Sequence, residues 1–269
     1  VWMTVNPEIF GFPDSTAAVR FAFITVGIWW AVFSVPLLLY VKEPPSEGGS
    51  PRNGVVRAAL RQLMNTFKSI RRLKTICLFL AAYWLYIDGV DTIFRMAVDY
   101  GISIGLNHRD LIKALLITQF VGFPSAIAFG YLGGKLGTKR CILMAIAMYI
   151  VVSIWGAFMH SQKEFYLMAI TIGLVQGGIQ ALSRSFFARI IPASKSAEYF
   201  GFYNMLGKFA AVVGPVLMGS VGLIASSMGC SGDLASRISI TSVSLLFISG
   251  GILFCFVDEE KGKKEAEFL

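Results

Sequence analysis

Charged and chemically reactive side chains are scarce in this chain of 269 residues. Asp, Glu, Lys and Arg make up 15% of it, whereas soluble domains carry about 25%. It has two histidines and four cysteines, and no two cysteines form a C-x-x-C pair. This composition argues against a soluble domain, a zinc site and a disulfide framework. We therefore expect no metal and no cofactor, and we expect the cysteines to be small buried apolar side chains.

Motifs for catalysis and for nucleotide binding are absent as well. The apolar segments contain no H-E-x-x-H, no G-x-S-x-G and no paired-Asp cleavage motif. The chain also lacks the G-K-[ST] signature of a phosphate-binding loop, so a gradient of ions or solute is the expected energy source. The net charge is +8, but the basic residues lie at the ends of apolar segments instead of in one patch. We therefore expect neither an enzyme nor a nucleic-acid partner.

Apolar residues, in contrast, dominate the chain. They make up 55% of it, and the mean hydropathy is +0.67. A helix needs about 20 apolar residues to cross a bilayer, and seven segments qualify. The predicted fold class is therefore an all-α integral membrane protein with seven transmembrane helices. The predicted spans are 21–41, 75–98, 111–132, 141–159, 165–183, 200–226 and 238–257.

Lysine and arginine are distributed unevenly between the connections of these spans. Of the 24 lysines and arginines, seventeen lie in alternate connections, four lie in the other connections, and three lie within or at the edges of spans. This asymmetry places the basic connections in the cytoplasm. The predicted divisions are an external segment 1–20, a spanning helix 21–41, a cytoplasmic linker 42–74, a six-helix half 75–257 and a cytoplasmic tail 258–269. Because the amino end is expected outside the membrane without a signal peptide, we expect earlier spans to precede it in the complete protein.

The linker 42–74 contains a predicted amphipathic helix. Residues 55–73 place apolar side chains on one face and five basic ones on the other. A calmodulin-binding segment has a similar pattern. The neighbouring spans favour a helix that lies on the inner membrane surface, so anionic lipid headgroups are the expected partner of residues 55–74.

The most unusual residues lie inside the second span. Asp88, Asp91 and Arg95 follow the spacing i, i+3, i+7, so a helix places them on one stripe. A charge at the centre of a bilayer costs at least about 2.5 kcal/mol. We therefore expect the stripe to face protein or water and to mark a solute or ion pathway. The alternative is a structural i, i+4 pair of Asp91 and Arg95, with Arg95 reaching the interface.

Two later spans carry further polar side chains. Gln176 and Gln180 share one face of the fifth span, where they act either as interhelical hydrogen-bonding groups or as part of the pathway. The glycines of G-L-V-Q-G, at positions 173 and 177, permit a close helix contact. In the sixth span, Asn204 and Lys208 lie one turn apart. Lys208 either reaches the interface or pairs with a carboxylate, for which Asp88 is the natural candidate.

The connection after the third span resembles the loop motif of the major facilitator superfamily. It reads G-Y-L-G-G-K-L-G-T-K-R and is predicted to form a glycine-rich cytoplasmic turn. The residues that match the motif are Gly130, Leu132, Lys135, Gly137, Lys139 and Arg140. Gly134 stands where the superfamily has an aspartate, which removes an acid expected to help close the cytoplasmic gate.

Three longer stretches resemble the vacuole-effluxer branch of that superfamily, which comprises the autophagy-related vacuolar amino-acid exporters and their bacterial relatives. They are Y-I-D-G-V-D-T-I at 86–93, G-L-V-Q-G-G-I-Q-A-L-S-R at 173–184, and S-A-E-Y-F-G-F-Y-N at 196–204. The resemblance implies twelve spans, of which these seven would be the last, with the N-terminal half as the missing partner. It also implies transport of a small solute, with amino acids as the candidate substrates, by alternating access.

Within that resemblance, Asp88 or Asp91 would be the carboxylate linked to a proton or another cation, while Lys208 and Gln180 would contact the solute. A bacterial inner membrane is favoured over a vacuolar one. The alternative function is a seven-helix receptor or sensor without transport. A retinal-binding sensor is disfavoured because the span 238–257 has no lysine.

Overall fold

The computed structural model describes residues 3, 6–41, 61, 64, 67–70, 73–103 and 105–267, with the side chains of 108 and 109 excepted. The chain divides into two units, Val1–Val56 and Arg57–Leu269, which we describe separately. The described parts of both units are helical and contain no strand. Within the described residues, seven helical segments are long and apolar enough to cross a membrane, which confirms the predicted all-α membrane fold.

The first unit contains one long helix. A short 3-10 helix, η1 (Pro7–Phe10), ends at Gly11, whose φ of 75° suits a residue without a side chain. Helix α2 (Ser15–Tyr40) then begins after Asp14, whose carboxylate accepts a hydrogen bond of 2.7 Å from the Ala17 N–H. α2 therefore starts six residues before the predicted span.

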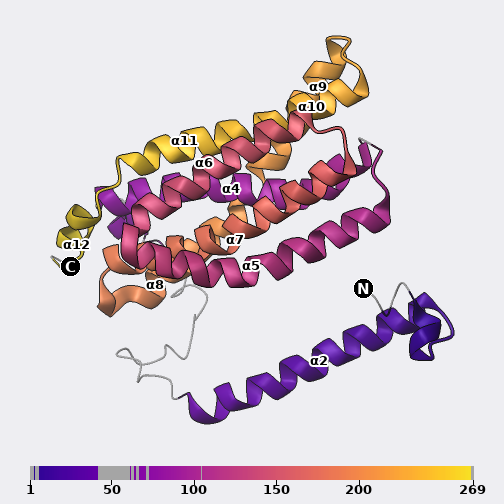
Figure 1. The fold of residues 1–269 in the computed structure, drawn as a ribbon. Coiled ribbons are helices and arrows are strands. Elements are labelled where there is room, and N and C mark those ends of the chain that lie inside the picture. The colour runs from indigo at the N-terminus through magenta and orange to yellow at the C-terminus, as the bar shows by residue number, and fades with distance from the viewer. Residues whose placement is uncertain are drawn as a thin grey trace. The chain divides into compact units, whose positions relative to one another are not determined.

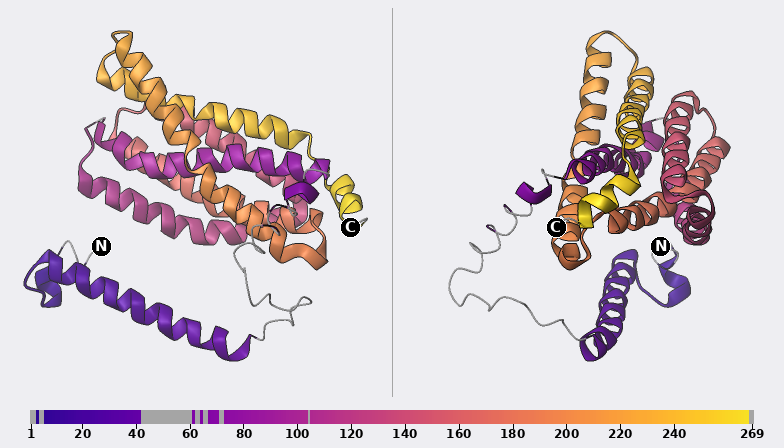
Figure 2. Two further views of the ribbon diagram at one scale, coloured as in Figure 1. Left: turned by 180° about the vertical axis from the view of Figure 1, so that it is seen from behind. Right: turned by 90° about the vertical axis from the view of Figure 1, so that its left-hand side faces the viewer.

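The second unit is a bundle in which α4 lies at the centre (Figure 1 and Figure 2). Its long helices are α4 (Lys74–Ser103), α5 (His108–Leu136), α6 (Thr138–Phe158) and α7 (Gln162–Ile190). The shorter elements are η2 (Ala193–Lys195), α8 (Ser196–Ala210), α9 (Val213–Ser227), α10 (Gly232–Ser242), α11 (Ser244–Cys255) and α12 (Glu259–Glu267). α8 and α12 lie at one end of this bundle, and the α9–α10 turn lies at the other (Figure 1).

The last two spans are each built from two helices. The sixth span breaks at Ala211 and Val212, between α8 and α9. Pro215 accounts for this break, because its nitrogen cannot donate to the Ala211 carbonyl and its ring obstructs a continuous helix. The seventh span is interrupted at Val243, the single residue between α10 and α11.

Glycines bring α5 and α7 into close contact. A Cβ at Gly173 would lie 2.7 Å from the Thr118 carbonyl oxygen, and one at Gly177 would lie 3.0 Å from the Gly122 carbonyl oxygen. Both distances involve backbone atoms, which cannot move aside as a side chain can. The predicted close approach at Gly173 and Gly177 is therefore confirmed, and it sets the spacing of these two helices.

The predicted glycine-rich turn at 130–140 is mostly helical. α5 continues to Leu136, and the connection to α6 consists of Gly137 alone, with φ of 89°. The prediction of a longer turn was wrong, because Gly130 and Gly134 lie within α5, where glycine costs only about 1 kcal/mol relative to alanine. Lys135 lies over the Tyr131 ring at 4.5 Å, and Arg140 is exposed.

The first turn of α6 supports the end of α11. The Lys139 ammonium donates to the carbonyls of Cys255 and Val257 at 2.8 and 2.6 Å. A cation at a helix carboxyl end satisfies carbonyls that lack intrahelical partners. Lys139 therefore ties the carboxyl end of α11 to the start of α6.

α12 packs against the adjoining ends of α4 and α7. Glu265 accepts a hydrogen bond of 3.1 Å from the Thr75 N–H at the start of α4. Glu259 lies 3.5 Å from Arg189 of α7 and 3.1 Å from Lys263 within its own helix. Hydrogen bonds from the Lys263 ammonium to Glu259 and Glu260 raise the pKa of Lys263 above its usual value. The residues that follow the last span therefore continue the fold as a docked helix.

Two smaller predictions have different outcomes. The amphipathic helix 55–73 lies largely outside the described residues, although Ile70 and Leu73 of that segment are buried in the core. The expectation of four buried cysteines was wrong, because only Cys141 is buried while Cys77 and Cys255 are exposed. Their exposure fits side chains on the lipid-facing surface of a membrane bundle.

Candidate functional site

A polar cavity of about 270 Å³ lies among α4, α7 and α8. Each helix presents two polar side chains spaced four residues apart, so that both point the same way. The pairs are Asp91 and Arg95 from α4, Gln180 and Arg184 from α7, and Asn204 and Lys208 from α8. All six belong to helices that are apolar enough to cross a membrane.

An aromatic wall forms one side of this cavity. The rings of Tyr83 and Tyr203 stack with centroids 4.2 Å apart, and Phe187 stacks on Tyr203 at 5.0 Å. Gly207 leaves room for the Tyr83 hydroxyl, which would lie 3.4 Å from a Cβ at that position. The wall therefore gives a solute a flat aromatic surface in the same cavity as the charged side chains.

The cavity has an excess of positive charge. Arg95, Arg184 and Lys208 contribute three cationic groups, and Asp91 contributes one carboxylate. The charges of Arg95 and Lys208 both act on Asp91. Among the described residues, however, none of the four takes part in an ion pair within 4.0 Å. These charged groups are therefore free to bind a ligand that carries both signs of charge.

The structure brings five of the seven predicted pathway residues together in this cavity. They are Asp91, Arg95, Gln180, Asn204 and Lys208. Gln176 is half-buried on α7 and Asp88 is buried on α4, and neither lines the cavity. Neither of the two ion pairs that the sequence left open as alternatives is formed. Lys208 shares the cavity with Asp91 instead of pairing with Asp88, and Asp91 and Arg95 do not approach within 4.0 Å.

Five residues that line the cavity were not among the predicted site residues: Tyr83, Ile87, Arg184, Tyr203 and Gly207. Arg184 was assigned to a cytoplasmic connection, but α7 continues past it to Ile190. Its position four residues after Gln180 was the signal that could have identified it. Tyr83 and Tyr203 carried no such signal, because aromatic residues are frequent in every span of this chain.

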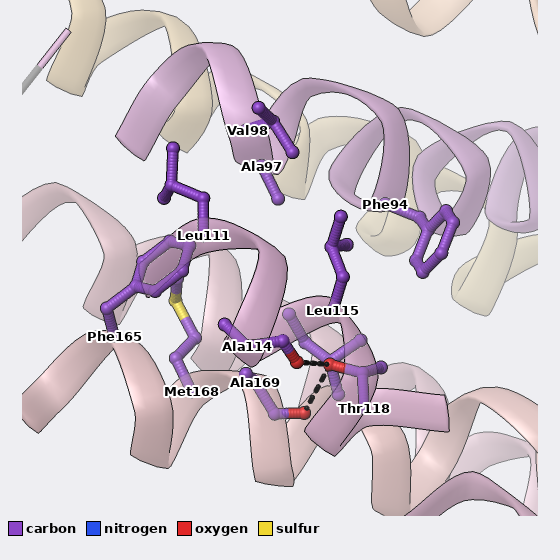
Figure 3. Close-up of a pocket in the computed structure, with 11 residues that line it drawn as sticks. Phe94, Ala97, Val98, Leu111, Ala114, Leu115, Thr118, Phe165, Met168 and Ala169 are labelled. Atoms are coloured by element: carbon purple, nitrogen blue, oxygen red, sulfur yellow. Dashed lines mark hydrogen bonds between the residues drawn. The ribbon is translucent and has the colours of Figure 1, made fainter. Parts of the chain in front are cut away.

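A second hollow is too small to be a binding site. It encloses about 20 Å³ between α4, α5 and α7 and is lined by apolar side chains (Figure 3). Its hydroxyl group, from Thr118, already bonds to the carbonyls of Ala114 and Ala169 at 3.0 and 3.1 Å. A volume of this size holds about one water molecule, and apolar walls keep such a space dry. Within the described residues there is also no group of three His, Cys, Asp or Glu side chains arranged to hold a metal ion.

Comparison with known proteins agrees with this architecture. A family model described as "Vacuole effluxer Atg22 like" matches residues 2–267. An uncharacterized MFS-type transporter YxiO of Bacillus subtilis is 35% identical over 91% of this chain and 55% of its own length. Autophagy-related protein 22 of Yarrowia lipolytica is 27% identical over 95% of this chain and 47% of its own length. No solved structure matches.

The chain spans about half the length of the curated relatives it matches. The family match, in contrast, covers nearly all of the chain and includes every residue of the polar cavity. These findings confirm the resemblance seen in the sequence and identify a multi-pass membrane protein. The chain belongs to the Atg22-like vacuole effluxer family of major facilitator transporters.

Proposed function

We propose that the chain provides one side of the solute pathway in a secondary transporter. The observation that carries this proposal is the polar cavity, in which unpaired charges of both signs lie within membrane-spanning helices. Ionisable groups are costly inside a membrane and usually mark a pathway. Alternating access places such a site between two halves of the protein, and the matched relatives are about twice as long as this chain. The family favours transport over a receptor or sensor function.

The chemistry of the cavity suits an amino acid. A carboxylate would meet Arg184 and Lys208, guanidinium and ammonium groups that form strong charge-assisted hydrogen bonds. An ammonium group would meet Asp91, and an apolar side chain would pack on the Tyr83–Tyr203 wall. Because three cationic groups face one anionic group, this half of the site favours acidic over basic amino acids.

Direct binding tests this proposal. We expect the purified chain in detergent to bind radiolabelled glutamate more tightly than leucine, and leucine more tightly than lysine. The order follows from the excess positive charge of the cavity, and raising the salt concentration should reduce the difference. Lysine binding as tight as glutamate binding, or no binding of any of the three, would contradict the proposed solute class.

The proposed orientation places residues 1–20 and the α6–α7 turn outside, and α12 in the cytoplasm. It rests on the uneven distribution of basic residues. A bacterial plasma membrane is the proposed location, supported by the higher identity to the Bacillus relative than to the Yarrowia one.

Cysteine labelling checks this orientation. In a background with the four native cysteines replaced, an impermeant maleimide should label His160→Cys in intact cells. It should label Lys263→Cys only after the cells are opened. Both positions are exposed or half-exposed, so access to the reagent depends on the side of the membrane. Labelling of Lys263→Cys in intact cells would reverse the orientation.

A further inference from the structure

Three buried oxygen atoms on α4 have no hydrogen-bond partner among the described residues. They are both carboxylate oxygens of Asp88 and the hydroxyl oxygen of Thr92. Asp88 is 1% exposed and Thr92 is fully buried. An unsatisfied buried polar group costs about 1–3 kcal/mol, and a charged one costs more. Such a cluster in a membrane-spanning helix calls for a ligand that supplies the missing interactions.

The three oxygens gather at the break in the sixth span. Asp88 and Thr92 lie one helical turn apart and face Gly214 in the first turn of α9. A methyl group at Gly214 would overlap the Thr92 hydroxyl and lie 3.2 Å from Oδ1 of Asp88. The same break contains the Ala211 carbonyl, which Pro215 deprives of its usual backbone donor. The site thus combines a carboxylate, a hydroxyl and an interrupted helix.

The surroundings of Asp88 favour a positively charged ligand. The amino-terminal end of α9 lies beside this carboxylate, and its dipole, equivalent to about half a positive charge, offsets only part of the negative charge. Asp91, one helical turn further along α4, adds a second negative charge near Asp88. Arg95 and Lys208 line the polar cavity instead, and within the described part of the chain no cationic side chain pairs with Asp88.

We propose that Asp88, Thr92 and the α8–α9 break form a sodium site. This proposal deepens the proposed function, because it names the coupling cation and separates its site from the solute cavity. A small hard cation suits oxygen ligands, and a single carboxylate balances a single positive charge. A proton would occupy only one of the three oxygens and leave the others unsatisfied. Interrupted helices supply carbonyl oxygens to sodium in other transporters.

Thermal unfolding of the detergent-purified chain tests the site without requiring transport. At fixed pH and ionic strength, replacing choline by sodium should raise the unfolding temperature. The rise should be roughly 5–10 °C when sodium is at about a hundred times its Kd. Potassium should give a smaller shift. Asp88→Asn should abolish the sodium shift, and Thr92→Val should weaken the apparent sodium affinity about tenfold.

Matched variants distinguish binding from loss of folding. Asp99→Asn alters an exposed carboxylate on the same helix, and Thr171→Val removes an exposed hydroxyl from α7. Both should keep the wild-type sodium response. If Asp88→Asn fails to fold, the apparent sodium affinity of the nearly isosteric Thr92→Val variant still tests the site. Equal stability in sodium and choline, a response to pH alone, or an unchanged sodium affinity in Thr92→Val would overturn the proposal. Failure to bind amino acids would instead count against the proposed function and leave the sodium result intact.

Discussion

Gly173→Ala is expected to destabilise the second unit, although alanine forms helices better than glycine by up to about 1 kcal/mol. The added Cβ would lie 2.7 Å from the Thr118 carbonyl oxygen and 3.1 Å from the Val121 Cβ. Because the first of these is a backbone atom, α5 must move away from α7. Overpacking of this kind typically costs about 1–3 kcal/mol. The expected result is a lower unfolding temperature in detergent, followed by fluorescence.

Gly219→Ala provides the control for this prediction. Gly219 lies within α9, and a Cβ there would meet no atom within 4 Å. Its substitution should leave the unfolding temperature unchanged or raise it slightly, because only the helix propensity changes. Equal behaviour of the two variants would show that the close contact of α5 and α7 does not determine stability.

The spans themselves could be predicted because they depend on a local property. A run of about 20 apolar residues identifies a membrane-spanning helix without knowledge of its neighbours. All seven predicted segments correspond to spans in the structure, and most extend beyond the predicted ends. The added turns carry polar or charged residues, as at Arg184 in α7. A prediction from hydropathy misses these turns, because it ends each span at the first polar residues.

The function of each charged residue depends on tertiary contacts and was harder to predict. Asp88 and Asp91 are three residues apart, which separates them by about 60° around the helix axis. That rotation places Asp91 in the polar cavity and Asp88 against α9. The sequence showed that both carboxylates lie on one stripe. It could not show where α8 ends, and the break after Ala210 is what places these two side chains in different surroundings.

Arg184→Met should reduce glutamate binding about ten- to a hundredfold, because a hydrogen bond to a charged group contributes about 1.5–3 kcal/mol. Methionine keeps much of the length of the side chain and removes the guanidinium. Arg184 has no ion-pair partner among the described residues, so its loss leaves no acidic group of the protein unpaired. The effect should therefore appear in solute binding, measured with radiolabelled glutamate, and not in the unfolding temperature.

Arg189→Met is the matched control on the same helix. Arg189 lies outside the polar cavity and contacts Glu259 at 3.5 Å in an exposed pair. Exposed pairs contribute about 0–1 kcal/mol, so this variant should retain glutamate affinity within about twofold. A general loss of positive charge would affect both variants alike, whereas a direct contact affects Arg184→Met alone. If Arg184→Met binds glutamate like the wild type, the carboxylate does not meet Arg184, and Lys208 and Arg95 remain to account for anion binding in the cavity.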